Sequence, residues 1–103
     1  MPRPYSEAFL IDLAKKDADC LGIKLAKLCV SANIPAIFVA AALETSPTTV
    51  YGWFRGRGIR ENRFRTVEVF IDFLEADLAG RRLPASSVKD AKEYIESIIG
   101  AKI

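Results

Sequence analysis

The sequence predicts an all-α fold, a compact bundle of five to six helices with a helix-turn-helix at its centre. Apolar residues recur at spacings of three and four in successive segments, as on the buried face of a helix. Serine, asparagine, proline and glycine separate these segments where helices begin and end. No segment shows a convincing strand pattern. At 103 residues, with 50% hydrophobic and 27% charged residues, the chain is expected to form a single domain with one modest core.

The first third of the chain predicts two helices, or one helix that bends between Asp19 and Gly22. Ser6 is placed to cap the first helix with its hydroxyl group. The second helix is expected over residues 21–32, and Asn33 suits a left-handed end. Gly22 weakens helical continuity by up to about 1 kcal/mol. Arg3, between two prolines, is either a candidate for a minor-groove contact or part of an ordinary chain end.

Two short helices are expected at the centre of the chain. Pro35 opens the first. Ser46 and Pro47 begin the second, over residues 47–55, because the serine can cap free N–H groups and the proline ring is pre-set for the first helical turn. Gly56 ends it. Two short helices joined by three or four residues form a helix-turn-helix, whose second helix can fit a DNA major groove.

The C-terminal part predicts a helical pair over about residues 62–100. The first helix of the pair has a core stripe made of Val67, Phe70, Ile71, Leu74 and Leu78. Val69 and Phe73 lie off that stripe, as candidates either for a dimer contact or for packing under the N-terminal helix. The second helix begins at Ser86 or Ser87. Its expected inner face consists of Val88, Ala91, Ile95, Ile98 and Ile99.

Eight residues within the motif, which covers about residues 35–56, follow a known spacing. They are Val39, Ala40, Leu43, Ser46, Val50, Trp53, Arg55 and Gly56. This pattern resembles the helix-turn-helix of lambda-repressor-like (Cro-type) proteins, and the resemblance implies a relation to phage, prophage or mobile-element regulators. Ala40 has to be small because the second helix crosses close over it. Glu44 stands where these proteins usually have glycine, and a left-handed backbone there would cost glutamate roughly 1 kcal/mol.

Positive charge is concentrated in and just after the motif. Five arginines against two glutamates give residues 34–65 a charge of +3, whereas residues 1–33 carry +1 and residues 66–103 carry −2. Such asymmetry suggests a surface for a polyanion. The resemblance and the charge together predict seven DNA-binding residues: Thr48, Thr49, Tyr51, Gly52, Arg55, Arg57 and Arg60.

The positions expected to meet base edges are Pro47, Thr48, Tyr51 and Gly52, and they are poor in the glutamine, asparagine and arginine forks that discriminate bases by roughly 1–3 kcal/mol each. Thr48 and Tyr51 are expected to contact DNA, with more of the affinity coming from arginine–phosphate contacts. The alternative for the arginines is a solvated loop that pairs with the acidic helix. The acidic residues in question are Glu68, Asp72, Glu75 and Asp77. Trp53 is expected in the core, and Phe54 either at the core edge or as an exposed contact.

Catalytic and metal sites are not expected. The chain has no histidine, and Cys20 and Cys29 lack metal-ligand spacing, so no metal, cofactor or catalytic residue is predicted. No run of 18 apolar residues and no signal-peptide layout is present. We therefore expect a cytoplasmic protein without a membrane partner.

The sequence thus predicts a small transcriptional regulator that binds duplex DNA as a homodimer. One alternative is a protein-interaction module of the same fold that docks onto a host regulator or polymerase. Another is a largely non-specific DNA-binding protein. All three keep the same helix-turn-helix and differ in what its outer surface contacts.

Overall fold

The computed structural model describes residues 5–16 and 20–101, so Arg3 lies outside the described residues. Within these ranges the chain forms six α-helices and no strand. They are α1 (Glu7–Ala14), α2 (Leu21–Ala32), α3 (Ala36–Ala42), α4 (Pro47–Phe54), α5 (Glu61–Ala79) and α6 (Val88–Ile99). The predicted all-α bundle of five to six helices is therefore confirmed.

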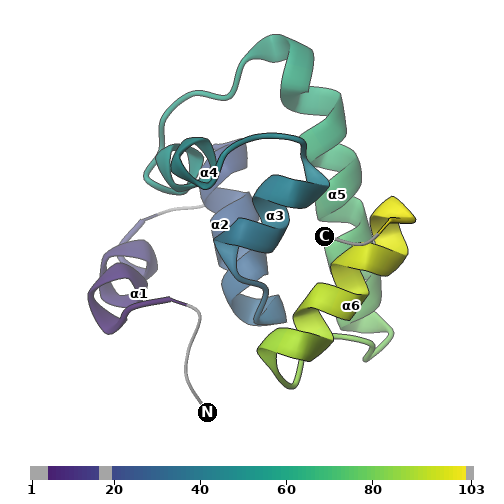
Figure 1. Ribbon diagram of the computed structural model, residues 1–103. Coiled ribbons are helices and arrows are strands. Elements are labelled where there is room, and N and C mark those ends of the chain that lie inside the picture. The colour runs from purple at the N-terminus through teal and green to yellow at the C-terminus, as the bar shows by residue number, and fades with distance from the viewer. Residues whose placement is uncertain (1–4, 17–19, 102–103) are drawn as a thin grey trace.

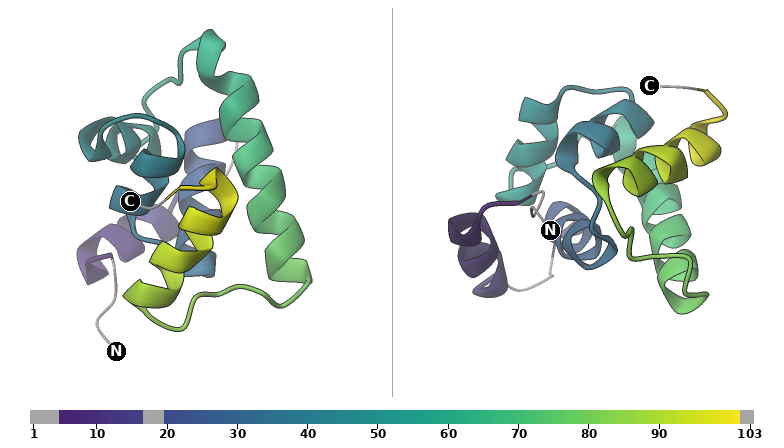
Figure 2. Two further views of the ribbon diagram at one scale, coloured as in Figure 1. Left: turned by 45° about the vertical axis from the view of Figure 1, so that its right-hand side comes forward. Right: turned by 60° about the horizontal axis from the view of Figure 1, so that its bottom comes forward.

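The helices surround one hydrophobic core, and the whole measures 32 × 28 × 25 Å. The long helix α5 packs along α2, while α3 contacts both α4 and α6 (Figure 1). Helix α1 lies on the opposite side of the molecule from α5 and α6 (Figures 1 and 2). This arrangement leaves α4 and the loop that follows it at one end of the bundle.

Several helix ends follow directly from the local sequence. The Ser6 hydroxyl accepts a hydrogen bond from the backbone N–H of Phe9, which caps α1. Asn33 ends α2 in the left-handed conformation, with φ 58°. Its side-chain amide donates to the carbonyl of Ala85 at 2.8 Å, which ties the α2–α3 junction to the start of α6. The first third of the chain is therefore two helices, with the predicted second range of 21–32.

Four side chains settle or correct expectations about the core. Phe54 is only 1% exposed, so it belongs to the core rather than to an outer contact. Val88 was expected on the inner face of the last helix, but it is 52% exposed because it lies at the first residue of α6, where the helix surface is still open to solvent. Val69 and Phe73 are exposed as well, so the expected alternative of packing under the N-terminal helix is wrong.

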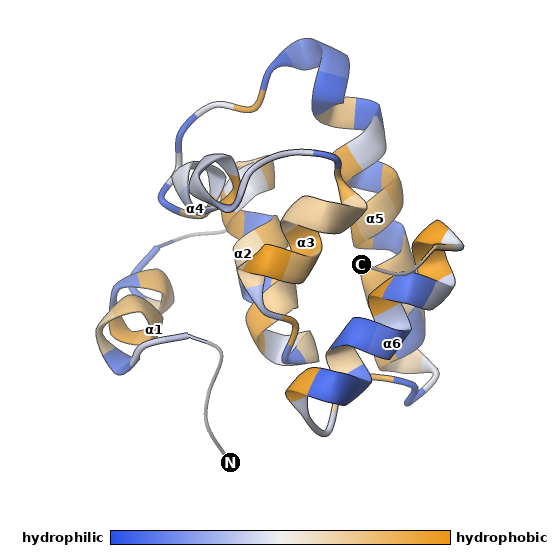
Figure 3. Cartoon of the chain, viewed as in Figure 1, coloured by the Kyte–Doolittle hydropathy of each residue, from blue (hydrophilic) through white to orange (hydrophobic). Residues whose placement is uncertain are grey.

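The distribution of hydropathy matches this packing. Apolar residues dominate α3, whereas charged residues cover much of the loop before α5, its first turns and the outer side of α6 (Figure 3). No single helix in the described ranges is long and apolar enough to cross a membrane. Helices α2 and α3 meet that length and composition only as a pair, and they are bent by 118° relative to each other.

Candidate nucleic-acid interface

The second helix of the motif, α4, is defined by its cap. Ser46 has extended backbone angles, and its hydroxyl accepts a hydrogen bond from the backbone N–H of Thr49 at 3.2 Å. The Ser46 and Thr49 hydroxyl oxygens are also 2.9 Å apart. Pro47 occupies the first turn, and Gly56, with φ 100°, follows the last. Eight residues are thereby fixed as one helix whose outer side includes exposed Thr48 and Thr49.

The turn between α3 and α4 is tight and strained. Glu44 has φ 54°, the left-handed conformation anticipated at this position, which disfavours a side chain with a Cβ. The backbone N–H of Thr45 donates to the carbonyl of Ala40 at 3.0 Å and closes the turn. Arg63, from the first turn of α5, donates through Nη1 to the carbonyl of Leu43 at 2.7 Å. The arginine thus links the end of α3 to the start of α5.

Close packing against α2 fixes the position of α4. Val50, Trp53 and Phe54 are buried, with exposed fractions of 0, 6 and 1%. A Cβ added at Gly22 would lie 2.3 Å from the carbonyl oxygen of Trp53, so only glycine allows the two backbones to approach this closely. The glycine that locally weakens α2 is therefore required by the α2–α4 contact.

One side of α4 is covered by α1. The ring of Phe9 meets the ring of Tyr51 edge-on, with 6.0 Å between centroids, and also packs near Phe54 at 6.2 Å. Tyr5 stacks on Phe9 at 5.3 Å, and its buried hydroxyl donates to the carbonyl of Ile34 at 2.5 Å. Burial raises the pKa of Tyr5 well above its ordinary range, so the hydroxyl keeps its proton for this bond. Helix α1 therefore packs on α4 through Phe9, while Tyr5, just before α1, binds the residue Ile34 that precedes α3.

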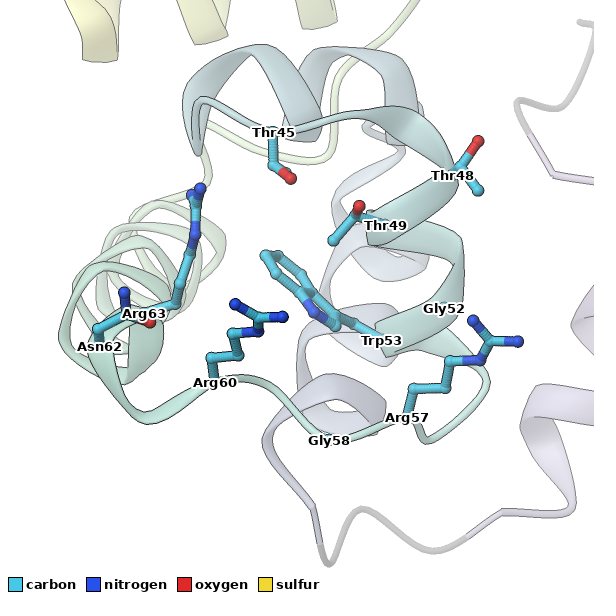
Figure 4. A pocket seen from close by; sticks show the side chains of 10 residues that line it. All are labelled: Thr45, Thr48, Thr49, Gly52, Trp53, Arg57, Gly58, Arg60, Asn62 and Arg63. Carbon is cyan, nitrogen blue, oxygen red and sulfur yellow. The ribbon is translucent and has the colours of Figure 1, made fainter.

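The uncovered side of α4 borders a cavity of about 480 Å³ between α4, the loop after it and the first turn of α5 (Figure 4). Its lining consists of Thr45, Thr48, Thr49, Gly52, Trp53, Arg57, Gly58, Arg60, Asn62 and Arg63. The Trp53 indole lies between the two walls, with threonine side chains on one side and those of Arg60 and Arg63 on the other (Figure 4). No carboxylate is among the described residues that line it, which combine cations, hydroxyl groups and an aromatic surface.

The arginines at this surface are available to an anion. Arg55, Arg57 and Arg60 are exposed. Among the described residues, the ion pairs join Lys16 to Asp12, Lys24 to Glu75 and Arg82 to Asp77, and none uses an arginine of residues 55–65. The alternative in which the acidic helix pairs with these arginines is therefore not what the described residues show. Guanidinium groups left open in this way suit phosphate.

The structure brings five of the seven residues predicted to bind DNA to one place. Thr48, Thr49, Gly52, Arg57 and Arg60 all line the cavity. Gly52 is buried, and the Arg57 side chain lies over it. A Cβ added at Gly52 would lie 3.3 Å from Cδ of Arg57.

The other two predicted residues lie elsewhere on α4. Tyr51 is half-buried against α1, as described above. Arg55 is exposed at the end of α4, and its carbonyl accepts a bond from Nζ of Lys16 at 3.4 Å. Tyr51 was expected on the open side because the periodicity of α4 gives no information about α1, which packs on it from residues 7–14.

Three polar lining residues were not among the predicted ones. Thr45 lies in the turn, and Asn62 and Arg63 lie in the first turn of α5. Arg63 also donates to the Leu43 carbonyl, so it contributes to the fold as well as to the cavity. The sequence offered one usable signal, since Asn62 and Arg63 directly follow the arginine-rich loop.

Comparisons with protein families, with curated proteins and with solved structures found no match for this chain. The surface is therefore interpreted from its own chemistry. Among the described residues, no group of three or more histidine, cysteine, aspartate or glutamate side chains is placed to hold a metal ion.

Proposed function

We propose that this protein binds duplex DNA through α4 and acts as a small transcriptional regulator. The observation that carries the proposal is the cavity beside α4, where the guanidinium groups of Arg57 and Arg60 meet threonine hydroxyls, with no carboxylate among the described lining residues. A helix-turn-helix whose second helix has an exposed outer side supplies the element that enters a major groove. The lambda-repressor-like spacing of the motif residues also supports DNA binding through α4.

The two kinds of side chain are proposed to do different work. Arg57 and Arg60 bind backbone phosphates, which contributes affinity without sequence information. Thr48 and Thr49 face the base edges, where a hydroxyl donates or accepts and a methyl group touches thymine. Because threonine lacks the two-pronged contacts that discriminate bases strongly, base preference is expected to be modest.

Salt-dependent binding tests the proposal. Labelled duplexes of random and genomic sequence are titrated with protein at two salt concentrations, and fluorescence anisotropy gives the dissociation constants. The variant Arg57→Ala/Arg60→Ala is expected to bind all sequences roughly tenfold to a hundredfold more weakly at 0.1 M salt, and to lower the slope of log K against log salt by about 2.

A matched control removes the same charge elsewhere. Lys89 and Lys92 are exposed on α6, and neither side chain makes an ion pair among the described residues. Lys89→Ala/Lys92→Ala gives the same net charge as the arginine double variant and is expected to keep most of the affinity. If the two double variants lost the same affinity for DNA, the loss would come from net charge alone, and the proposed interface would be refuted.

Two results would redirect the assignment. Absence of duplex binding at low salt would favour the alternative of a protein-interaction module that docks onto a host regulator or polymerase. Equal affinity for every sequence, together with no change of preference in Thr48→Val, would favour a largely non-specific DNA-binding protein. Thr48→Val keeps the shape of the side chain and removes only the hydroxyl.

A further inference from the structure

The outward face of α5 carries two exposed apolar side chains that the bundle does not use. Val69 is 40% exposed and Phe73 is 48% exposed, whereas Val67 and Phe70 on the inner face are 0 and 3% exposed. Val69 and Phe73 are four residues apart, so they lie next to each other on one side of the helix. They form an apolar patch on the longest helix of the molecule.

Two opposite charges lie on either side of Val69 along the helix. Arg65 precedes Val69 by four residues and Asp72 follows it by three, so all three lie along one stripe of α5. Arg65 and Asp72 are both exposed. In the described part of the chain, neither side chain takes part in a salt bridge. At a rise of about 1.5 Å per residue, the two charges are roughly 10 Å apart along the helix.

A two-fold axis passing through Val69 makes the stripe complementary to itself. In a helix pair related by this axis, the same face of each helix contacts the other copy, and the two chains run in opposite directions. Val69 then meets Val69 of the second copy. Arg65 lies four residues before Val69, and Asp72 of the second copy lies three residues after the Val69 of that copy. Because the second helix runs in the opposite direction, the two side chains lie at nearly the same level, within one residue's rise along the helix axis. The symmetry forms this ion pair twice.

A parallel pairing lacks this match. It would place each arginine at the level of the other copy's arginine and each aspartate at the level of the other copy's aspartate. The charges of the stripe therefore select the antiparallel arrangement, in the way that edge charges select the orientation of coiled coils.

We propose that the α5 stripe, made of Arg65, Val69, Asp72 and Phe73, is the docking site for a second copy of this chain, packed antiparallel. One helix pair covers less area than a standard stable interface, so the dimer is of the weak class, with a dissociation constant in the micromolar range. This inference locates the surface of self-association and does not rest on DNA binding. A monomer that binds DNA, or a dimer that does not, would separate the two proposals.

Sedimentation equilibrium over roughly 1 to 500 μM protein measures the association. The wild type is expected to show a monomer–dimer equilibrium, and Val69→Asp to weaken it at least tenfold. Ile37→Asp is the matched control, since Ile37 is 60% exposed on α3, outside the stripe. It should leave the dissociation constant unchanged.

Charge reversal tests the register. Arg65→Asp and Asp72→Arg should each weaken self-association at least tenfold, because each variant brings like charges together. The double variant Arg65→Asp/Asp72→Arg should recover most of the affinity. An equimolar mixture of the two single variants should also associate, because the aspartate introduced in one copy then meets the arginine introduced in the other.

A monomer at every concentration would overturn the proposal and leave the stripe to another partner. A dimer that Val69→Asp leaves intact would overturn it too. Failure of both the double variant and the mixture to recover association would refute the antiparallel register. Circular dichroism of each variant confirms that these exposed substitutions leave the helices folded.

Discussion

Replacing Gly22 with alanine tests whether the α2–α4 contact sets the position of the proposed DNA-binding helix. An alanine Cβ would lie 2.3 Å from the carbonyl oxygen and 2.9 Å from the carbonyl carbon of Trp53. Both are backbone atoms, which cannot rotate aside as the end of a side chain can. Since ordinary contacts require about 3.5 Å, α2 and α4 must separate by roughly 1 Å.

Two opposing terms set the size of the effect. Alanine favours a helix over glycine by about 0.8–1 kcal/mol, so α2 taken alone would be stabilised. Forced overpacking typically costs about 1–3 kcal/mol, and a clash with rigid backbone belongs at the upper end. The net loss is expected to be about 2 kcal/mol. For a domain of this length, that lowers Tm by roughly 8–16 °C.

Thermal unfolding followed by far-ultraviolet circular dichroism measures the change. Gly58→Ala serves as the control, because a Cβ at Gly58 would meet no atom within 4 Å and its backbone is not left-handed. Its Tm should stay close to the wild-type value. If Gly22→Ala unfolds at the same temperature as the wild type or higher, helix propensity outweighs the contact and the reasoning is refuted.

Three further predictions concern the turn and the buried hydroxyl and thiol groups. Glu44→Gly should increase the free energy of unfolding by up to roughly 1 kcal/mol and so raise the urea midpoint, because glycine removes the strain of the left-handed backbone. A lower midpoint would show that this strain is absent. Tyr5→Phe should lose about 1–2 kcal/mol in the same assay, since the Ile34 carbonyl loses its buried donor. Burial raises the folded-state pKa of Cys29 and Tyr5, and burial together with the hydrogen bond to Asp77 raises that of Tyr94. Their stabilising contribution is therefore complete at neutral pH and falls as pH rises above roughly 8.5 to 10, where the unfolded groups ionise. Unfolding measured at stepwise higher pH should show this loss, and a flat profile up to about pH 11 would contradict it.

Helix ends and helix number could be predicted because they depend on neighbouring residues. The Ser46 cap, Pro47 in the first turn and Gly56 after the last each act within four residues of their own position. The same holds for Asn33, whose left-handed conformation ends α2. The core stripe of α5 follows from period alone. Because these features depend on residues close together in the chain, they can be predicted from a single sequence.

The candidate site was predicted in part, for a physical reason. Thr48 could be chosen because a helix-turn-helix leaves that position outside the contact between its two helices, and Arg57 and Arg60 because positive charge is concentrated just after the motif. The placement of Tyr51 could not, because Phe9 covers it from 42 residues earlier in the chain. The role of Arg63 could not be predicted either, because it binds the Leu43 carbonyl, 20 residues away in the chain.

The sequence by itself determined the all-α fold of five to six helices, the helix-turn-helix and the basic segment that follows it. Only the tertiary structure decided which side of α4 stays open, since that depends on α1 arriving from one flank and α5 from the other. Gly22 shows the difference most clearly. Locally it only weakens a helix, but in the fold it lets two backbones approach, because packing joins segments whose spacing along the chain carries no periodic signal.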